Sequence, residues 1–269
     1  MKQVLRPKIK PKLLKRNNLD RPVGMEFYSE ELSLLFFGRD AEADTLLNQV
    51  VKHRMSLLIG SSGIGKTSLI SAGLFPKLHE LGWRTALIRP LTAPIENLCK
   101  SLWGQLMEAT LPGEFDFRTV VHSVANAYAG THVLIVIDQF EDVLGSKAFQ
   151  DVESLTGSLF DLHTSAEDNL RFLISYRGDI EAQLGGVWQK VSGSAEGLPR
   201  LYLGALSEEG CEKALDENLK ALGISLSDNR KGRGHFLKTQ IVEDLKRESL
   251  LAGFVGIYPP FFADDYFKG

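Results

Sequence analysis

The stretch SLLIGSSGIGKTSLI, from Ser56 to Ile70, decides the fold of this chain. An apolar run ends at Gly60, small residues and glycines follow it, and a lysine, a threonine and further apolar residues come next. Flexible residues between a strand and a helix raise the entropy cost of folding, so they need a compensating gain. The spacing from Gly60 to Thr67 fits G-x-x-x-x-G-K-[ST], the pattern of a phosphate-binding loop.

This loop has a physical reason for each residue type. Successive backbone N–H groups must point at the phosphate, and glycine best allows those dihedral angles and the close approach. The next helix begins at the anion, so its free N–H groups and its dipole also face the phosphate. Lys66 supplies charge to the outer phosphates and Thr67 an oxygen to Mg²⁺. We expect the nucleotide to contact Gly60, Ser61, Ser62, Gly63, Ile64, Gly65, Lys66, Thr67 and Ser68.

A second apolar run, VLIVI from Val133 to Ile137, is typical of a strand that is buried on both faces. Asp138 follows it directly, where a P-loop protein carries the carboxylate that holds Mg²⁺. The alternative is that Asp138 only ends the strand in a turn. Because the same chain carries the phosphate-binding loop, we favour Thr67 and Asp138 as the metal ligands.

Three of the residues that follow Asp138 in the chain are candidates for orienting the attacking water. Many vigorous ATPases of the additional-strand class have a glutamate directly after the aspartate, whereas this chain has Gln139. We rank Glu141 first, Gln139 second and Asp142 third, since a glutamine orients water in some GTPases. Either Glu141 reaches the water or hydrolysis is slow. The alternative role of Glu141 is that of a carboxylate at a helix start.

Arg177 stands near the end of the stretch LRFLISYRGD, which runs from Leu170 to Asp179. The end of a parallel strand beside a phosphate site is where a sheet presents chemistry, and a planar cation suits phosphate. We therefore place Arg177 at the γ-phosphate. A salt bridge to Asp179 or a plain surface charge is the alternative.

Short apolar runs that alternate with helical segments predict an α/β fold with a parallel sheet covered on both faces. The expected strands are Met55 to Gly60, Arg84 to Pro90, Val133 to Ile137, Leu170 to Asp179 and Pro199 to Leu206. The expected helices include Thr67 to Lys77, 93–109, 117–128 and 147–164. We divide the chain into a basic flexible arm (1–24), a P-loop NTPase domain (25–206) and a partial helical subdomain (207–269).

Composition and charge narrow the functional classes. The chain is 43% hydrophobic and 24% charged, as in ordinary globular proteins, and no apolar run reaches the ~20 residues that span a bilayer. Two cysteines without metal-binding spacing indicate reduced thiols and a cytoplasmic location. Residues 1–22 hold eight basic residues and one acidic residue, although the net charge is −3. We favour a solvated tail for this arm, with nucleic acid or an acidic partner as the alternative.

Several motifs together resemble the STAND class of signal-transduction P-loop ATPases, and in particular its novel STAND branch in bacteria. DQFED is similar to the DQFEE of that branch, and SAGLFPKL is similar to its SAGLLPxL helix. Asp142 departs from this pattern. The resemblance covers roughly residues 36–206 and includes FFGRDAEADTLL, GSSGIGKTSLISAGLFPKL, LIRPLTAPIENL, VLIVIDQFED and FLISYRGDIEAQL.

The resemblance implies ATP and Mg²⁺ as ligands and a five-stranded sheet in the order 5-1-4-3-2. It places Gly38 and Arg39 near the adenine and ribose, and Arg177 at the γ-phosphate. It also places a proline of GIYPPFF, Pro259 or Pro260, beside the nucleotide. The phosphate and metal ligands that it implies are Lys66, Thr67 and Asp138.

The function that the resemblance implies is that of a regulatory ATP switch. Such a switch oligomerises with ATP bound and controls an effector, in a setting such as defence against phage. Family members usually carry further domains, so we expect either a fragment or a small ATPase whose sensor and effector sit on other chains. The main alternative is an AAA-type ATPase that loads or moves along DNA, which the basic arm favours. A GTPase is less favoured because no N-K-x-D motif is present. A small-molecule kinase and a scaffold that holds ATP without hydrolysis also stay open.

Overall fold

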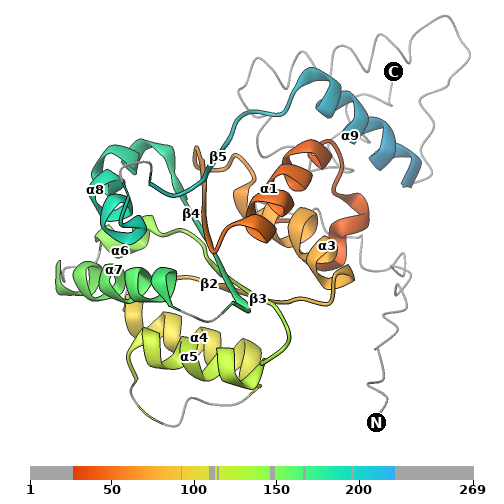
Figure 1. The fold of residues 1–269 in the computed structure, drawn as a ribbon. Coiled ribbons are helices and arrows are strands. Elements are labelled where there is room, and N and C mark those ends of the chain that lie inside the picture. The colour runs from red at the N-terminus through yellow and green to blue at the C-terminus, as the bar shows by residue number, and fades with distance from the viewer. Residues whose placement is uncertain are drawn as a thin grey trace, which may run out of the picture.

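The computed structural model describes residues 27–91, 93–108, 113, 115–145, 149–165, 168–194 and 197–221. Three predicted features lie outside these residues: the arm at 1–24, the proline motif with Pro259, and most of the helical subdomain at 207–269. Within the described part, the chain forms an α/β unit with helices on both faces of a sheet (Figure 1).

Five parallel strands form this sheet, as the sequence pattern predicts. Their order is β2-β3-β4-β1-β5, which confirms the order that the family resemblance implies. Because β4 lies between β1 and β3, the residue that ends β3 faces the loop after β1 across one intervening strand. The strands are β1 (Met55–Gly60), β2 (Arg84–Ile88), β3 (Val133–Ile137), β4 (Leu170–Arg177) and β5 (Arg200–Leu203).

The strand register brings the carboxyl ends of the strands to one edge of the sheet. Gly60 of β1 lies opposite Arg177 of β4, and Ile137 of β3 lies opposite Ile88 of β2. In open parallel sheets, ligands bind just outside this edge. The residues that directly follow Gly60, Ile88 and Ile137 therefore lie at this shared edge of the sheet.

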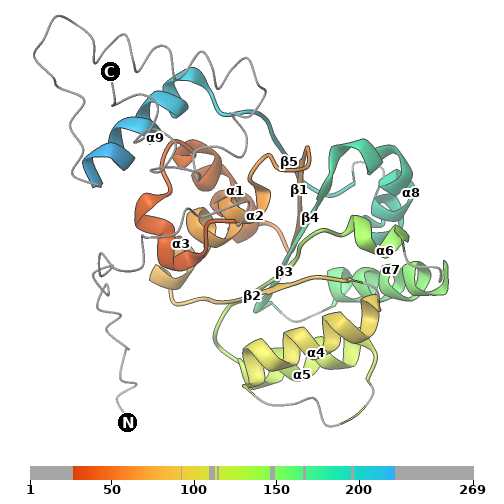
Figure 2. The same ribbon diagram turned by 180° about the vertical axis from the view of Figure 1, so that it is seen from behind.

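The helices cover the sheet in two layers. Figure 2 shows α1, α2 and α3 on one side of the strands, and α4, α5, α7 and α8 on the other. No helix within the described ranges is both long and apolar enough to cross a membrane. The helices are α1 (Asp40–Lys52), α2 (Lys66–Ser68), α3 (Phe75–Glu80), α4 (Pro94–Met107), α5 (Phe117–Ala127), α6 (Glu141–Gly145), α7 (Phe149–Thr164), α8 (Glu181–Ser192) and α9 (Glu208–Ala221). Short 3₁₀ helices occupy Glu30–Leu35 and Gly178–Ile180.

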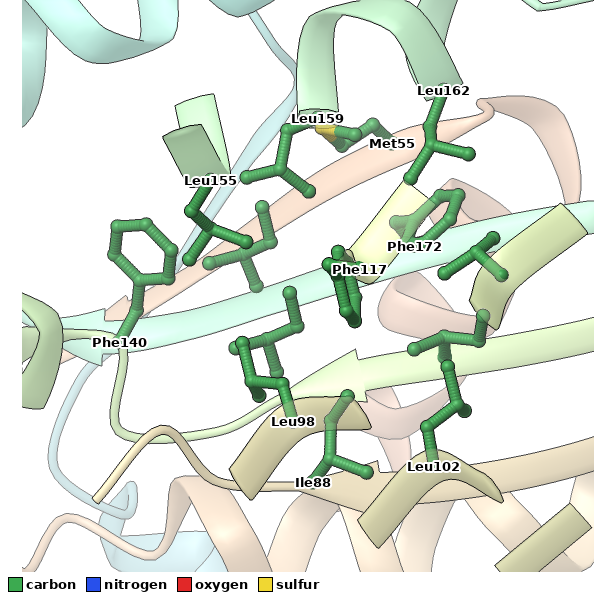
Figure 3. Close-up of a cluster of buried hydrophobic side chains, with 14 of the residues drawn as sticks. Met55, Ile88, Leu98, Leu102, Phe117, Phe140, Leu155, Leu159, Leu162 and Phe172 are labelled. Carbon is green, nitrogen blue, oxygen red and sulfur yellow. The ribbon is translucent and has the colours of Figure 1, made fainter. Parts of the chain in front are cut away.

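A large apolar core fills the space between the sheet and α4, α5, α7 and α8 (Figure 3). Full burial of one large aliphatic or aromatic side chain contributes about 1.5–3 kcal/mol. The packing of this face therefore fixes the strands whose ends carry the polar residues described below. Its helical side chains include Leu98, Leu102, Phe117, Leu155, Leu159 and Leu162, which pack against Met55 and Phe172 of the strands.

The sequence pattern does not predict α8, because Gly185 and Gly186 stand in its middle. Each glycine in a helix interior costs about 1 kcal/mol relative to alanine. Leu184 and Trp188 are nevertheless fully buried, and Trp188 Nε1 donates a hydrogen bond to the Tyr176 hydroxyl at 3.1 Å. Burial of one helix face thus outweighs poor helix propensity here.

The helix after the phosphate-binding loop contains a π-helical segment, Leu69–Leu74, between α2 and α3. The sequence predicts a helix from Thr67 to Lys77 with Pro76 near its end, but the helix continues to Glu80. A proline inside a helix removes one backbone hydrogen bond and crowds an earlier carbonyl. Because the π turn ends just before α3, Pro76 takes a first-turn position, where its missing N–H costs little.

The first helix after the sheet, α9, touches the loop before α1 through backbone atoms. Gly38 has φ of 85°, and a Cβ placed on it would lie 2.3 Å from the Gly210 carbonyl oxygen. A Cβ on Gly210 would lie 2.8 Å from the Gly38 carbonyl oxygen. Only glycine fits either position. Leu206, Cys211 and Ala214 form a small buried cluster beside this contact, with Phe37 packed against it.

We expect Gly38→Ala to lower the free energy of unfolding more than Gly130→Ala does. Both glycines have φ of 85°, but a Cβ on Gly130 meets no atom within 4 Å. The left-handed conformation costs a non-glycine residue roughly 1–2 kcal/mol in both variants. The clash with Gly210 adds a further penalty of about 1–3 kcal/mol in Gly38→Ala alone. Urea unfolding of the two variants measures the difference, and equal losses would contradict the backbone contact.

Candidate functional site

The phosphate-binding loop connects β1 to α2. Gly65 has φ of 97°, a left-handed conformation that glycine adopts without strain, and it caps the first turn of α2. Ser61, Ser62 and Gly63 are exposed, whereas Ile64 is buried in the core on the α1 side of the sheet. The loop is therefore anchored by one apolar side chain and leaves three residues open to solvent.

Lys66 begins α2 and is almost fully buried. Its Nζ donates hydrogen bonds to the carbonyl oxygens of Gly60 at 2.8 Å and Ser61 at 3.0 Å. Burial lowers the pKa of Lys66, and the nearby Glu141 and Asp138 carboxylates partly offset that effect. The loop thus holds the ammonium group against its own backbone, at the carboxyl edge of the sheet.

Thr67 and Asp138 are joined directly. The Thr67 hydroxyl donates to Asp138 Oδ2 at 2.8 Å, and the Ser175 hydroxyl of β4 donates to Asp138 Oδ1 at 2.6 Å. Asp138 is fully buried. Hydroxyl and carboxylate oxygens are hard ligands of the kind that Mg²⁺ takes in P-loop sites, so this pair fits the metal. That Thr67 and Asp138 hold Mg²⁺ stays a prediction.

Arg89, which follows β2, was not among the residues singled out from the sequence. Its Nε and Nη2 donate to Asp138 Oδ2 at 3.2 and 3.0 Å. Ile88 pairs with Ile137 in the register of β2 and β3, so the residues after them lie side by side. A charged residue directly after an apolar strand is the signal that could have identified it, once the order of the strands is known.

The three candidates for orienting water stand at the turn after β3. Gln139 has φ of 58°, an uncommon conformation for a residue other than glycine. Glu141 begins α6, and its Oε2 accepts a hydrogen bond from the Arg177 backbone N–H at 3.3 Å. Burial raises the pKa of Glu141, and the neighbouring Lys66 opposes this shift. Glu141 therefore lies close to the lysine of the loop, while the choice among Glu141, Gln139 and Asp142 stays open.

Arg177 ends β4 beside Gly60, but its side chain pairs with Asp179. Its Nε and Nη2 donate to the two carboxylate oxygens at 3.0 and 2.6 Å, and its side chain is about half exposed. This is the ion pair that the sequence left open as the alternative role. Water screens an exposed pair of this kind, so it is easily broken. Contact between Arg177 and a γ-phosphate stays a prediction.

Arg39 is buried and joins three parts of the chain. Its Nη2 donates to the Gly204 carbonyl oxygen at 2.8 Å and to the Ile64 carbonyl oxygen at 3.5 Å, and its Nη1 pairs with Glu42 at 2.6 Å. One guanidinium thus connects the phosphate-binding loop, the segment after β5 and the start of α1. The predicted contact of Arg39 with the adenine or ribose is additional to these bonds and stays a prediction.

Ser68 and Pro259 are also predicted to contact the nucleotide. The Ser68 hydroxyl accepts a hydrogen bond from the Tyr28 backbone N–H at 3.1 Å, so the segment before α1 is bound to the helix after the loop. Pro259 lies outside the described residues. Every predicted site residue that the structure describes therefore lies at or beside the carboxyl edge of the sheet, and Arg39 contacts the loop through the Ile64 carbonyl oxygen.

Comparison with known proteins gives a family and a fold. The model of the family described as Novel STAND NTPase 1 matches residues 23–248. The Walker-type ATPase PABY2304 of Pyrococcus abyssi superposes with a TM-score of 0.58 and 14% identity, covering 82% of this chain and 65% of that chain. The ORC2 protein of Aeropyrum pernix, solved as ADPNP–ADP complexes, gives 0.51 and 18%, covering 68% and 52%. At such identities the two structures share the fold, and this chain spans only part of their length.

A weaker similarity concerns sequence alone. The Ras-related protein RABC2a of Arabidopsis thaliana is 24% identical over 166 residues, which cover 60% of this chain and 73% of that protein.

We expect Ser175→Ala to lower the free energy of unfolding by about 1–3 kcal/mol, because it leaves one oxygen of a buried carboxylate without its donor. Ser56 offers a matched control, since it is equally buried in β1 and its hydroxyl makes no hydrogen bond within the described residues. Ser56→Ala should change the stability little. Thermal or urea unfolding compares the two variants, and equal destabilisation would argue against the bond between Ser175 and Asp138.

Proposed function

Because the chain belongs to the Novel STAND NTPase 1 family, we propose that it is a Mg²⁺-dependent ATP switch with slow hydrolysis. The observation that carries this proposal is the bond between Thr67 and Asp138 beside Lys66, at the carboxyl edge of the sheet. The family accounts for nucleoside triphosphatase activity in general. The identity of the nucleotide, the rate and the output are our proposal.

The chain's own groups account for phosphate binding. The backbone N–H groups of the loop and of the first turn of α2 would hold the phosphate oxygens. Lys66 would exchange the carbonyl oxygens of Gly60 and Ser61 for phosphate oxygens. Thr67 and Asp138 would hold Mg²⁺, which would neutralise phosphate charge and polarise the γ-phosphoryl group.

Adenine is favoured over guanine as the base. The names of the two similar structures refer to an ATPase and to ADPNP–ADP complexes. The chain contains no N-K-x-D sequence, the motif that reads guanine in GTPases. We therefore propose ATP as the nucleotide, despite the similarity to a Ras-related protein.

Slow hydrolysis follows from the groups available to the water. Gln139, which stands directly after Asp138, cannot accept a proton as a glutamate does. Glu141 is nearby, but its carboxylate already accepts a hydrogen bond from the Arg177 backbone. The Arg177 guanidinium must also leave Asp179 before it can contact phosphate. A long-lived ATP state suits a switch better than a motor.

The switch needs a route from the nucleotide to another part of the protein. Arg39 bonds to Ile64 in the loop and to Gly204 between β5 and α9, and Gly38 touches α9. A phosphate-induced shift of the loop would therefore be felt at the start of the helical subdomain. We propose that this subdomain, with Pro259 near the nucleotide, transmits the state to oligomerisation or to an effector. Cytoplasmic signalling in antiviral defence is the setting that we propose.

A DNA-acting ATPase is the second candidate. The eight basic residues within positions 1–22 are the observation in its favour. The name of the ORC2 structure refers to nucleotides and not to DNA, so this similarity does not favour the second candidate. DNA-stimulated ATP turnover separates a loader or motor from a switch.

We expect Lys66→Ala to weaken ATP binding by roughly 10–100-fold, since a charged hydrogen bond to phosphate contributes about 1.5–3 kcal/mol. Lys77→Ala is the matched control, because Lys77 lies on α3 and pairs with Asp44 at 2.9 Å. Calorimetric titration with ATP and GTP gives the affinities, and phosphate release in the same samples gives the rate.

Each result of this experiment has a definite meaning. Tight ATP binding with slow phosphate release, lost in Lys66→Ala and kept in Lys77→Ala, supports the switch. Fast turnover that DNA raises further supports the second candidate instead. A wild-type protein that binds neither nucleotide contradicts the proposed function.

A further inference from the structure

Arg89 shares one carboxylate oxygen with the threonine that we expect to hold Mg²⁺. Asp138 Oδ2 accepts from Arg89 Nη2 at 3.0 Å, from Arg89 Nε at 3.2 Å and from the Thr67 hydroxyl at 2.8 Å. The other oxygen, Oδ1, is bound by Ser175. A cation that approaches between Thr67 and Asp138 therefore meets a guanidinium already seated on the same oxygen.

This ion pair is placed where it has a strong effect. The Asp138 side chain is 1% exposed and the Arg89 side chain 30% exposed, so water screens the pair poorly. The pair also supplies part of what a buried carboxylate needs, since an unpaired charge out of water is costly. Arg89 thus supplies positive charge at the carboxylate oxygen that we expect Mg²⁺ to approach.

Phe27 helps to hold Arg89 in this position. The Arg89 guanidinium carbon lies 5.5 Å from the centroid of the Phe27 ring, within the range of a cation–π interaction. The next residue, Tyr28, donates its backbone N–H to Ser68 in the helix after the loop. The segment at Phe27 and Tyr28 is therefore fastened both to Arg89 and to the phosphate-binding element.

Arg89 also interacts electrostatically with a second carboxylate, that of Asp142. Burial raises the pKa of Asp142, and Arg89 acts against this rise, so the guanidinium stabilises the Asp142 carboxylate as well. The electrostatic interaction places Asp142 in the neighbourhood of Arg89. Arg89 would then still have an anionic neighbour, Asp142, after its displacement from Asp138.

We propose that Arg89 is a built-in counter-ion of Asp138 that competes with Mg²⁺ for its carboxylate, and that Phe27 holds it there. The inference rests on the proposed function, since it presumes Mg²⁺ and ATP at this site. Arg89 is a positioning residue that acts through Asp138. The gain in ATP affinity that Mg²⁺ brings is smaller than it would be without Arg89, because the metal has to displace the guanidinium.

The experiment measures how much Mg²⁺ strengthens ATP binding. Calorimetry of the whole chain gives the ATP dissociation constant in EDTA and in excess Mg²⁺. The readout is the constant in EDTA divided by the constant in Mg²⁺. We expect Arg89→Gln to raise this ratio about tenfold, because the substitution removes the charged hydrogen-bond donor that competes with Mg²⁺ for Asp138. The change should appear as tighter binding in Mg²⁺, with the constant in EDTA nearly unchanged.

Two further variants and a control make the test specific. Phe27→Ala keeps every group around Asp138 and loosens Arg89, so it should raise the ratio in the same direction by less. Arg89→Lys keeps the charge without the two-pronged hydrogen bonding and should fall between wild type and Arg89→Gln. Arg118→Gln removes an arginine that pairs with Asp161 at 2.7 Å outside the phosphate site, and should leave the ratio unchanged.

The outcomes separate this inference from the proposed function. A ratio that is unchanged or lower in Arg89→Gln overturns the competition, and so does a change confined to the EDTA constant, which would mean that Arg89 contacts phosphate. Should Arg89→Gln fail to fold, Phe27→Ala decides by the same criterion. Wild-type protein that binds no ATP overturns the proposed function as well, whereas Mg²⁺-dependent binding with an unchanged variant overturns this inference alone.

Discussion

The carboxylate of Asp138 is the charge around which the functional edge of the sheet is organised. It is fully buried, and its two oxygens accept hydrogen bonds from Thr67, Ser175 and Arg89. These donors come from the helix after the loop, from β4 and from the end of β2. Removing the charged partner of a buried ion costs about 3–5 kcal/mol and removing a neutral hydroxyl donor costs less, so both kinds of donor stabilise this arrangement. One side chain thereby fixes four elements relative to one another.

Burial also sets the electrostatic character of the rest of the site. It lowers the pKa of Lys66 and raises the pKa of Glu141, and each of the two groups opposes the shift of the other. Opposite charges held in a partly dry place interact more strongly than they do in water. A phosphate that enters would therefore meet charges that already balance one another, and the Lys66 ammonium group would have to leave the Gly60 and Ser61 carbonyl oxygens in order to bind it.

The sequence predicts much of this architecture because its main signals are local. The loop from Gly60 to Thr67 and the five apolar runs are visible as patterns, so the strands and the parallel sheet follow from them. The helix α8 is not predicted, because burial of Trp188 outweighs two adjacent glycines. The role of Arg89 is also hidden, since it depends on β2 lying beside β3 in one particular register. Likewise the choice of Asp179 as the partner of Arg177 depends on side-chain conformation.

The bare contact between Gly38 and Gly210 has a consequence for how this sequence can vary over time. Most tight contacts can be repaired, because a larger side chain on one element is accommodated by a smaller one on the other. Here both partners are already the smallest residue, and each faces the backbone of the other. No second substitution can make room for a first one. We therefore expect these two positions, 172 residues apart in the chain, to be inherited together as glycines wherever α9 packs in this way.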